Sequence, residues 1–294
     1  MIKLGTLTAA ALAVSLVGMG VAADGVERPL ILGVAHIAFR VSDLPAAEKF
    51  YRDVLGLPRT NGGADCARYR LNFRQEIVVE SGLQPNTDER LSHLAFETSD
   101  LAALTEYFKA RNVPLDQAPS VPCVERNAVW VKDPDGHIIE FVQREPNSGP
   151  ETWKMGENEH PISTRVLHAG LTIRDAEAAD RFYRDVLGFS EFWRGGGSDT
   201  VTNWINMKVP NGTDYLEYML VSGTVTRQRL GSAHHVALMV PDIQAAYETA
   251  MARTPANARQ KLASPNVGRN GRWQLNLFDP DGSRVELMEP SRVR

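Results

Sequence analysis

The sequence predicts an α+β protein built from four copies of one small unit. Three observations support this prediction. A short apolar segment headed by His occurs four times, and each copy carries an Asp seven residues later; the copies begin at His36, His93, His168 and His235. Apolar residues at helical spacing follow each copy, and strand-like runs separated by turn residues come after the helical pattern. Repetition of this kind indicates one supersecondary unit per copy.

The first unit predicts a strand, a helix and at least two further strands. Either Ser42 or Asp43 can cap the helix, because both side chains accept a hydrogen bond from a free backbone N–H. Gly56 follows the last apolar residue of the helical pattern and ends it. Two strands are expected over residues 67–73 and 75–80, with room for one more short strand.

The second unit ends in a β-hairpin that contains Glu140. Strands are expected over residues 128–131 and 138–142, joined by the turn Asp133-Pro134-Asp135-Gly136. This turn is predicted to be structural. His137, which follows it directly, is expected to face solvent.

A stretch rich in proline and glycine divides the four units into two pairs. Residues 147–164 show no apolar periodicity and are predicted to form a linker. The flanking stretches, 30–146 and 165–291, each have the size of an ordinary domain of roughly 100–150 residues. We therefore expect two domains of two units each.

The second pair of units repeats the first. Residues 181–188 match residues 49–56 almost letter for letter, and a second Asp-Pro-Asp-Gly turn again precedes a Glu. The expected elements are strands around 199–209 and 214–221, a helix near 243–253, a strand over 273–278, the turn 279–282 and a strand over 283–287.

The first 23 residues have the pattern of a secretory signal peptide. Lys3 precedes an apolar stretch, and Val21-Ala22-Ala23 offers small residues for cleavage before Asp24. An uncleaved anchor is the alternative, but the apolar part is short and rich in glycine. We expect an exported, periplasmic protein without a membrane segment after cleavage.

The chain has two cysteines, Cys66 and Cys123. In an oxidising compartment they could form a disulfide, although sequence spacing does not show that their Cα atoms come close enough. Two unpaired small core residues are an equal alternative. The two cysteines make no metal-binding motif.

The charge balance argues against some partners. The chain carries 32 Lys and Arg against 36 Asp and Glu, a formal net charge of −4, and has no long basic stripe. Nucleic-acid binding requires such a stripe. We expect a small-molecule substrate as the partner rather than a nucleic acid or a membrane, and a homodimer is left open.

Histidines and acids repeat at positions that could bring them together. Side chains alternate between the faces of a strand, so Leu216 and Tyr218 suit the helix side while Glu217 points the other way. Glu286 similarly lies between two apolar neighbours. A His at the start of each unit, with acids in facing strands, could converge on one point. Imidazoles and carboxylates together suit a divalent cation such as Zn, Mn, Fe, Co or Ni.

These features together resemble the vicinal oxygen chelate superfamily, which includes glyoxalase I, extradiol ring-cleaving dioxygenases and bleomycin-resistance proteins. The resemblance rests on the His at the head of each unit, on Phe-Tyr-Arg-Asp-Val-Leu-Gly at 50–56 and 182–188, and on Asp-Pro-Asp-Gly before a Glu. It covers about residues 30–290. It implies four βαβββ modules that form two tandem domains with open, cup-shaped mixed sheets. It implies no single reaction, since one scaffold hosts unrelated chemistries.

The resemblance also implies metal ligands, residue by residue. The second half keeps every ligand position of the family: His168, Glu217, His235 and Glu286, with Glu217 and Glu286 as catalytic carboxylates. The first half keeps a smaller set: His36, His93 and Glu140. In the first half Val78 stands where the fourth ligand belongs, and Glu76 and Glu80 lie two residues to either side of it.

Modules of this superfamily pair in two ways, and the sequence leaves both open. Neighbouring modules can close one cup in each half of the chain. Alternatively, the modules are exchanged, and the complete site consists of His93, Glu140, His168 and Glu217. His168 and Glu217 belong to the complete site in both arrangements.

Three functions are candidates, and the number of ligands favours the first, a glyoxalase-type lyase or isomerase. Two His and two Glu leave two of six positions open for adjacent oxygens of a substrate, as resemblance to a glyoxalase-type lyase or isomerase implies. Two His and one carboxylate leave three positions open, as in extradiol dioxygenases that use Fe(II). Those enzymes carry a Tyr where Trp130 and Asn276 stand here. A non-catalytic binding protein of the resistance type is the third function, and the retained ligands count against it.

Overall fold

The structure is a computed structural model that describes residues 25–60, 62–84, 89–119, 123, 125, 127–145, 155–156 and 159–293. The predicted signal peptide (1–23) and much of the predicted linker (147–164) lie outside the described residues. Among the helices that the structure describes, none is long and apolar enough to cross a membrane.

The first two modules share one mixed sheet. Its seven strands are β1 (Ile31–Val41), β2 (Arg59–Thr60), β3 (Cys66–Arg70), β4 (Glu76–Ser81), β5 (Leu91–Thr98), β6 (Ala128–Lys132) and β7 (Ile138–Val142). They lie in the order β2-β3-β4-β1-β5-β7-β6. β1 is parallel to β4 and antiparallel to β5, so the two modules join along β1 and β5.

The last two modules form a second mixed sheet of the same plan. Its eight strands are β8 (Val166–Ile173), β9 (Ser190–Gly195), β10 (Trp204–Lys208), β11 (Tyr215–Leu220), β12 (His235–Met239), β13 (Asn266–Val267), β14 (Arg272–Phe278) and β15 (Arg284–Arg292). The order is β13-β14-β15-β12-β8-β11-β10-β9. The α+β fold with two curled sheets is therefore confirmed. Every described strand pairs within its own half of the chain, so the described part of the chain does not adopt the exchanged arrangement of modules.

Two modules depart from the expected boundaries. Among the described residues module two contributes three strands instead of the four of a βαβββ module. An isolated β-bridge between Asp116 and Trp130 lies beside them. In module three the strand expected from residue 199 begins only at Trp204, because the preceding residues form a loop closed by a hydrogen bond from Gly197 N to the Asn203 side chain. A helix not expected from the sequence, α4 (Arg227–Ala233), precedes β12.

The Asp that follows each His by seven residues caps a helix. In every module its side chain accepts a hydrogen bond from a backbone N–H in the first turn. The caps are Asp43 for α1 (Leu44–Glu48), Asp100 for α2 (Leu101–Ala110), Asp175 for α3 (Ala176–Asp180) and Asp242 for α5 (Ile243–Arg253). In modules one and three the chain continues directly as a π-helix, η1 (Lys49–Val54) and η2 (Arg181–Val186). The repeated Asp thus has a structural role.

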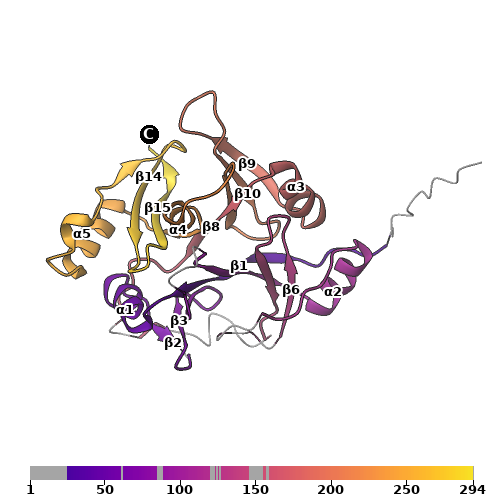
Figure 1. Ribbon diagram of the computed structural model, residues 1–294, viewed down its shortest axis with the longest axis horizontal. Helices are drawn as coiled ribbons and strands as arrows, with labels where there is room; N and C mark the ends of the chain where they lie inside the picture. The colour runs from indigo at the N-terminus through magenta and orange to yellow at the C-terminus, as the bar shows by residue number, and fades with distance from the viewer. Residues whose placement is uncertain are drawn as a thin grey trace, which may run out of the picture.

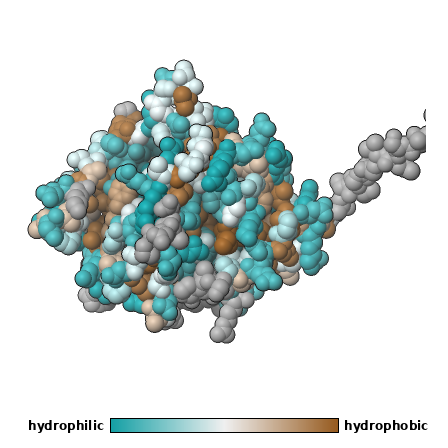
Figure 2. Space-filling model, viewed as in Figure 1, coloured by the Kyte–Doolittle hydropathy of each residue, from teal (hydrophilic) through white to brown (hydrophobic). Residues whose placement is uncertain are grey.

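The two sheets share one apolar core, to which both halves of the chain contribute. The rings of Phe96 and Phe189 meet edge to face across it, 5.3 Å apart. In Figure 1, α1 and α5 lie near each other on one side, and α2 and α3 on the other. Hydrogen bonds from Tyr107 Oη to the carbonyl of Val186 (2.7 Å) and from Arg253 to the carbonyl of Val54 (3.4 Å) join these pairs. On the face in Figure 2 hydrophobic residues are scattered among hydrophilic ones.

The two Asp-Pro-Asp-Gly turns bind the opposite half of the chain. Tyr51 donates a hydrogen bond to Asp279 (3.1 Å), and Tyr183 donates one to Asp133 (2.9 Å). All four side chains are buried. Each turn therefore docks onto the Phe-Tyr-Arg-Asp helix of the other half, so the two repeated motifs recognise each other across the interface.

The expectation that His137 faces solvent was wrong. Its side chain is 9% exposed and lies in a chain of hydrogen bonds between the two halves. Nδ1 contacts Asp133 (2.8 Å) and Nε2 contacts the Thr172 hydroxyl (3.3 Å); that hydroxyl also contacts His234 Nε2 (2.8 Å), and His234 Nδ1 contacts Glu89 (2.8 Å). The single proton of Thr172 serves only one imidazole. All four contacts are therefore satisfied together only when one of the two histidines is protonated on both nitrogens.

This network predicts a pH-dependent stability. Burial lowers the pKa of His137, but the hydrogen bond and charge of Asp133, followed by the charges of Glu89 and Asp135, outweigh it and raise the pKa. A raised pKa in the folded state gives stability that is complete below about pH 6.5, the value of an unfolded histidine, and is lost as pH rises through the folded pKa. His137→Gln should reduce the free energy of unfolding by about 2 kcal/mol at pH 6 and by less at pH 9.

Urea unfolding of the wild type and of His137→Gln at both pH values checks this expectation. His160→Gln is the matched control, because the His160 residue is exposed. An equal cost of His137→Gln at pH 6 and pH 9 would contradict the assignment.

Candidate metal centres

The register of the sheets places an acid opposite each of three histidine-headed strands. Glu140 pairs with Ala95, Glu217 with Gly170 and Glu286 with Ala237; each partner lies two residues after the His of its strand. Residues two apart share a face of a strand. The histidine and the acid of a module therefore lie on the same face of the sheet, which is the face turned away from the large apolar core.

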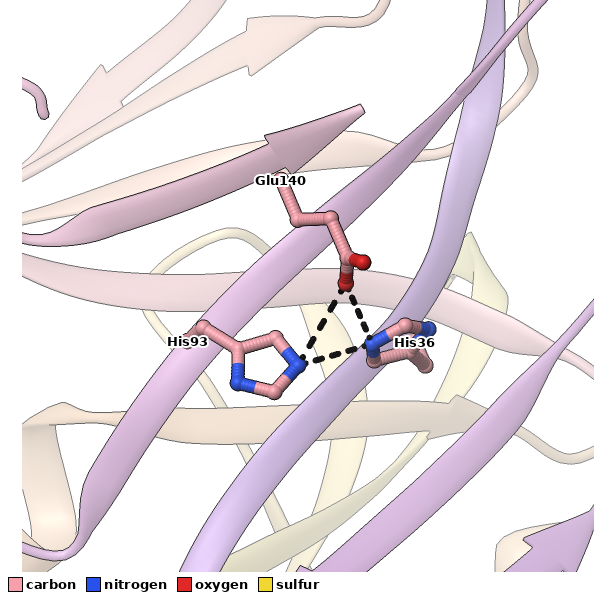
Figure 3. Close-up of side chains that lie close together, drawn as sticks. All are labelled: His36, His93 and Glu140. Carbon is pink, nitrogen blue, oxygen red and sulfur yellow. Dashed lines mark hydrogen bonds and ion pairs between the residues drawn. The ribbon is translucent and has the colours of Figure 1, made fainter. Parts of the chain in front are cut away.

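In the first cup His36, His93 and Glu140 converge (Figure 3). The Nε2 atoms of the two histidines are 2.9 Å apart, and the Glu140 carboxylate lies 2.9 Å from His36 and 3.4 Å from His93. All three side chains are at most 1% exposed. The three sequence-predicted residues of the first half are thus brought together.

In the second cup all four predicted residues converge. His168 and His235 face each other through Nε2 atoms 2.9 Å apart. The Glu217 carboxylate lies 3.7 Å from His168 and 3.5 Å from His235, and that of Glu286 lies 3.4 and 3.7 Å from the same atoms. Each carboxylate therefore meets both imidazoles.

Both clusters fit a divalent cation. In the second cup His235 Nδ1 lies 2.8 Å from the carbonyl of Ala233 and 2.7 Å from the Arg284 guanidinium, while its Nε2 faces the Nε2 of His168 at 2.9 Å. Two ring nitrogens this close repel each other unless a proton or a cation lies between them. Adjacent donors of an octahedral ion with bonds of about 2.1 Å lie about 3 Å apart, close to the separations found here. A divalent metal ion is therefore the cofactor that these donor sets suit.

The protonation equilibria of the clusters agree with this fit. Burial, and then the neighbouring charges, lower the pKa of His93 and His235 well below the usual range, so both imidazoles are neutral ligands. Burial raises the pKa of Glu217, with His168 opposing the shift and the charge of Glu286 adding to it. Burial likewise raises the pKa of Glu140, although His36, whose Nε2 lies 2.9 Å from the carboxylate, opposes the shift. A cation would offset the cost of burying these carboxylates.

Glu76 and Glu80 do not take the fourth ligand place in the first cup. Val78 pairs with Ala38, two residues after His36, which is the register that the acids of the other modules occupy. Glu76 is ion-paired with Arg68 and Arg70.

Glu80 supports a ligand instead of being one. It accepts a hydrogen bond from Ser92 (2.7 Å), whose oxygen contacts His93 Nδ1 (3.2 Å). Such a contact orients the imidazole of a ligand. The first cup therefore offers three protein donors.

A glycine that the sequence analysis did not single out and a disulfide that it left open shape the two cups. A β-carbon at Gly170 would overlap the imidazole of His235, so only glycine leaves room for this ring. The corresponding residues of the other modules are Ala38, Ala95 and Ala237, and this difference between the copies was a readable signal. In the first cup a disulfide joins Cys66 and Cys123, with Cα atoms 5.8 Å apart.

Introducing a carboxylate at position 78 tests the register. Val78→Glu should lower the melting temperature without metal, because it buries an unpaired charge in a cluster with Ala38 and the disulfide. Adding Zn²⁺ should raise the melting temperature of the variant by more than that of the wild type, because metal binding to the folded state alone stabilises it. Val79→Glu is the control, since Val79 faces the core. Equal zinc shifts in Val78→Glu and the wild type would refute the register argument.

A cavity borders the second cluster. This cavity has a volume of about 120 Å³ and is lined by Trp193, Trp204, Glu217, Met219, Arg269, Asn270, Gln274, Arg284, Glu286 and Met288. Both carboxylates of the cluster reach it, and the Glu217 side chain is 11% exposed, whereas that of Glu140 is fully buried. A small molecule in this cavity can therefore meet the two carboxylates of the second cup directly.

Comparisons with known proteins match both halves of the chain. The family model of the Glyoxalase/Bleomycin resistance protein/Dioxygenase superfamily matches residues 33–141 and 165–287. A lactoylglutathione lyase of Arabidopsis thaliana is 26% identical over 167 residues, which are 52% of this chain and 53% of that protein. The chain thus spans about half the length of this relative.

Two other known proteins match more of the chain. Metapyrocatechase 2 of Cupriavidus necator is 24% identical over 277 residues, 88% of this chain and 81% of that protein. The structure of the 2,3-dioxygenase LapB from Pseudomonas sp. KL28 has a TM-score of 0.68 at 18% identity and covers 90% of this chain and 94% of its own, which shows a common fold. Because the family model covers both sheets and both candidate metal centres, the chain belongs to the Glyoxalase/Bleomycin resistance protein/Dioxygenase superfamily, the vicinal oxygen chelate superfamily that its repeats resemble.

Proposed function

We propose that the second domain is the active site of a metal-dependent lyase or isomerase that moves a proton on a small substrate with two adjacent oxygens. The observation that carries this proposal is the cluster His168, Glu217, His235 and Glu286, in which two imidazoles each meet two carboxylates beside a cavity. Similarity to a lactoylglutathione lyase supports it.

The residues of the cup divide the work of such a reaction. His168 and His235 would hold the divalent ion together with the two carboxylates, and the ion would polarise an oxygen of the substrate and acidify the neighbouring C–H. Glu217 is the proposed proton acceptor, because its carboxylate lines the cavity and its side chain is 11% exposed against 4% for Glu286, so it can reach a C–H of a bound substrate. Tyr215 stacks on His168 with ring centroids 4.5 Å apart and holds that imidazole in place.

Hydrogen exchange tests this proposal. The full chain, loaded with Zn²⁺, Mn²⁺, Ni²⁺, Co²⁺ or Fe²⁺, is incubated in D₂O with a panel of α-hydroxy ketones and aldehyde–thiol hemithioacetals, and loss of the α-hydrogen signal is followed by NMR. We expect metal-dependent exchange that Glu217→Gln reduces by about a hundredfold or more. Absence of exchange on every substrate with every metal would refute the proposed reaction.

An extradiol-type dioxygenase is the second candidate, and the first cup favours it. Its His36, His93 and Glu140 form the two-histidine, one-carboxylate set that non-haem Fe(II) oxygenases use. Similarity to metapyrocatechase 2 over most of the chain supports this candidate. Oxygen uptake with Fe²⁺-loaded protein and a panel of catechols tests it, and no uptake on any catechol would argue against it.

We further propose that the protein acts after export. The apolar residues 1–23 support this proposal at the sequence level. The Cys66–Cys123 disulfide supports it independently, because such bonds persist in oxidising compartments such as the periplasm. Fractionation of the native host, with the N-terminal residue of the mature protein determined, tests this proposal. A protein found in the cytosol with Met1 intact would contradict it.

A further inference from the structure

The wall of the second cup is made of two tryptophans on neighbouring strands. Trp193 belongs to β9 and Trp204 to β10, and Trp204 pairs with Gly195 in the ladder between these strands. A β-carbon on Gly195 would meet the indole of Trp193, so this ring lies over Gly195, two residues further along the same strand. Glycine at position 195 therefore sets where the indole lies.

Trp193 and the proposed proton acceptor, Glu217, lie at the same level of the sheet on strands that flank β10. Trp193 pairs with Asn206, and Asn206 pairs with Glu217 on the next strand. Neighbouring strands are about 4.8 Å apart, which puts the backbones of Trp193 and Glu217 about 10 Å apart across the sheet. Met219, which pairs with Trp204, lines the same cavity. A ring with attached oxygens bridges a distance of this size.

The lining of the cavity is partly apolar and partly charged: it includes both indoles and Met219 as well as Glu217 and Glu286. A cavity of about 150 Å³ holds a whole benzene molecule, and the volume here is about 120 Å³, so an aromatic ring would fill it and extend into its opening. Both indoles are partly exposed. Within the described residues no ring contact joins either indole to another aromatic side chain, and both indoles line the cavity.

An ion pair holds the loop that joins the two tryptophan strands. Asp199, in the loop between β9 and β10, is ion-paired with Arg269, which itself lines the cavity. Both side chains are substantially exposed, and exposed pairs contribute little to stability. The ion pair therefore places the loop beside the cavity and adds little to the stability of this loop conformation.

From these observations we infer that the substrate carries a planar aromatic group, which stacks on Trp193 and Trp204 while its adjacent oxygens reach His168, Glu217, His235 and Glu286. This inference rests on the proposed function, because it assigns a substrate class to the same site. Trp193, Gly195 and Trp204 are then the residues that determine specificity. A substrate whose only recognised part is a short aliphatic chain would leave the indole wall uncovered.

Two small chelators test the inference directly. Acetohydroxamic acid and benzohydroxamic acid present the same pair of adjacent oxygens to a metal and differ in their methyl and phenyl groups. Their dissociation constants are measured by calorimetry on the Zn²⁺-loaded full chain, together with quenching of tryptophan fluorescence. We expect benzohydroxamic acid to bind about tenfold more tightly and to quench the fluorescence.

Variants separate the wall from the metal centre. Trp193→Leu and Gly195→Val should each weaken benzohydroxamic acid about tenfold and leave acetohydroxamic acid within about twofold. Trp193→Phe should retain most of the preference. Trp273→Phe is the matched control, because Trp273 packs on the core, and it should change neither constant.

The outcomes distinguish the two proposals. Equal affinities for the two chelators, or a phenyl preference that survives Trp193→Leu and Gly195→Val, would overturn the aromatic substrate class and leave the metal chemistry standing. Failure of acetohydroxamic acid to bind the zinc-loaded protein would overturn the proposed function, and the substrate class with it.

Discussion

Replacing His235 by alanine is expected to remove one of two metal ions per chain and to abolish the proposed hydrogen exchange. His235 Nε2 lies 2.9 Å from His168 and within 3.7 Å of both carboxylates of the second cup, so its loss removes a donor that contacts every other one. Loss of a supporting residue alone typically costs 10–100-fold in metal affinity, and loss of a ligand should cost more. We expect exchange to fall by more than about a hundredfold.

Metal content measured by elemental analysis after dialysis checks the stoichiometry. His93→Ala is the matched control in the first cup, and it should also lower the content from two ions to one while exchange continues. The double variant should hold none. Exchange that persists in His235→Ala but disappears in His93→Ala would move the active site to the first cup and contradict the account.

Breaking the disulfide is expected to produce the largest loss of stability. Cys66 and Cys123 are 57 residues apart, and closing a loop of that length restricts the unfolded chain by about 4 kcal/mol. The disulfide also packs against Val78 and Ala38 on the floor of the first cup. Addition of a thiol reductant should therefore lower the free energy of unfolding by about 4 kcal/mol.

Urea unfolding with and without reductant measures this effect. The double variant Cys66→Ala and Cys123→Ala should match the reduced wild type and should not respond to reductant. A wild type whose unfolding midpoint is unchanged by full reduction would contradict the prediction. Protein produced in a reducing compartment should show the same weakness.

The repeat predicted the fold because one pattern specifies each module. The strand headed by His, the capping Asp and the Asp-Pro-Asp-Gly turn act locally, so their consequences can be read from nearby residues. Pairing of each His with its acid could also be predicted, since alternation along a strand decides which side chains share a face. The register places Val78 opposite Ala38, at the strand position that the acids of the other three modules occupy.

What could not be predicted depends on contacts between distant segments. His137 looked like a turn residue because the groups that surround it, Thr172 and His234, belong to the other half of the chain. Whether Cys66 and Cys123 pair was open, because the segment around Cys123 has no periodic pattern. The tryptophan wall arises only once β9 and β10 lie side by side, and β9 itself was not expected. Of these residues only Gly195 is marked in the sequence, because it is the first of three consecutive glycines, a pattern that indicates a loop or a close approach of the backbone.

The central claim is that substrate oxygens meet the four donor residues of the second cup, and one crystal structure tests it. Crystals of the zinc-loaded protein with acetohydroxamic acid locate both the ion, by its anomalous scattering, and the chelator. The account predicts an ion among His168, Glu217, His235 and Glu286, with the two hydroxamate oxygens on it and the methyl group toward Trp193. A second cup without an ion, or a chelator bound at His36, His93 and Glu140 instead, would contradict the claim.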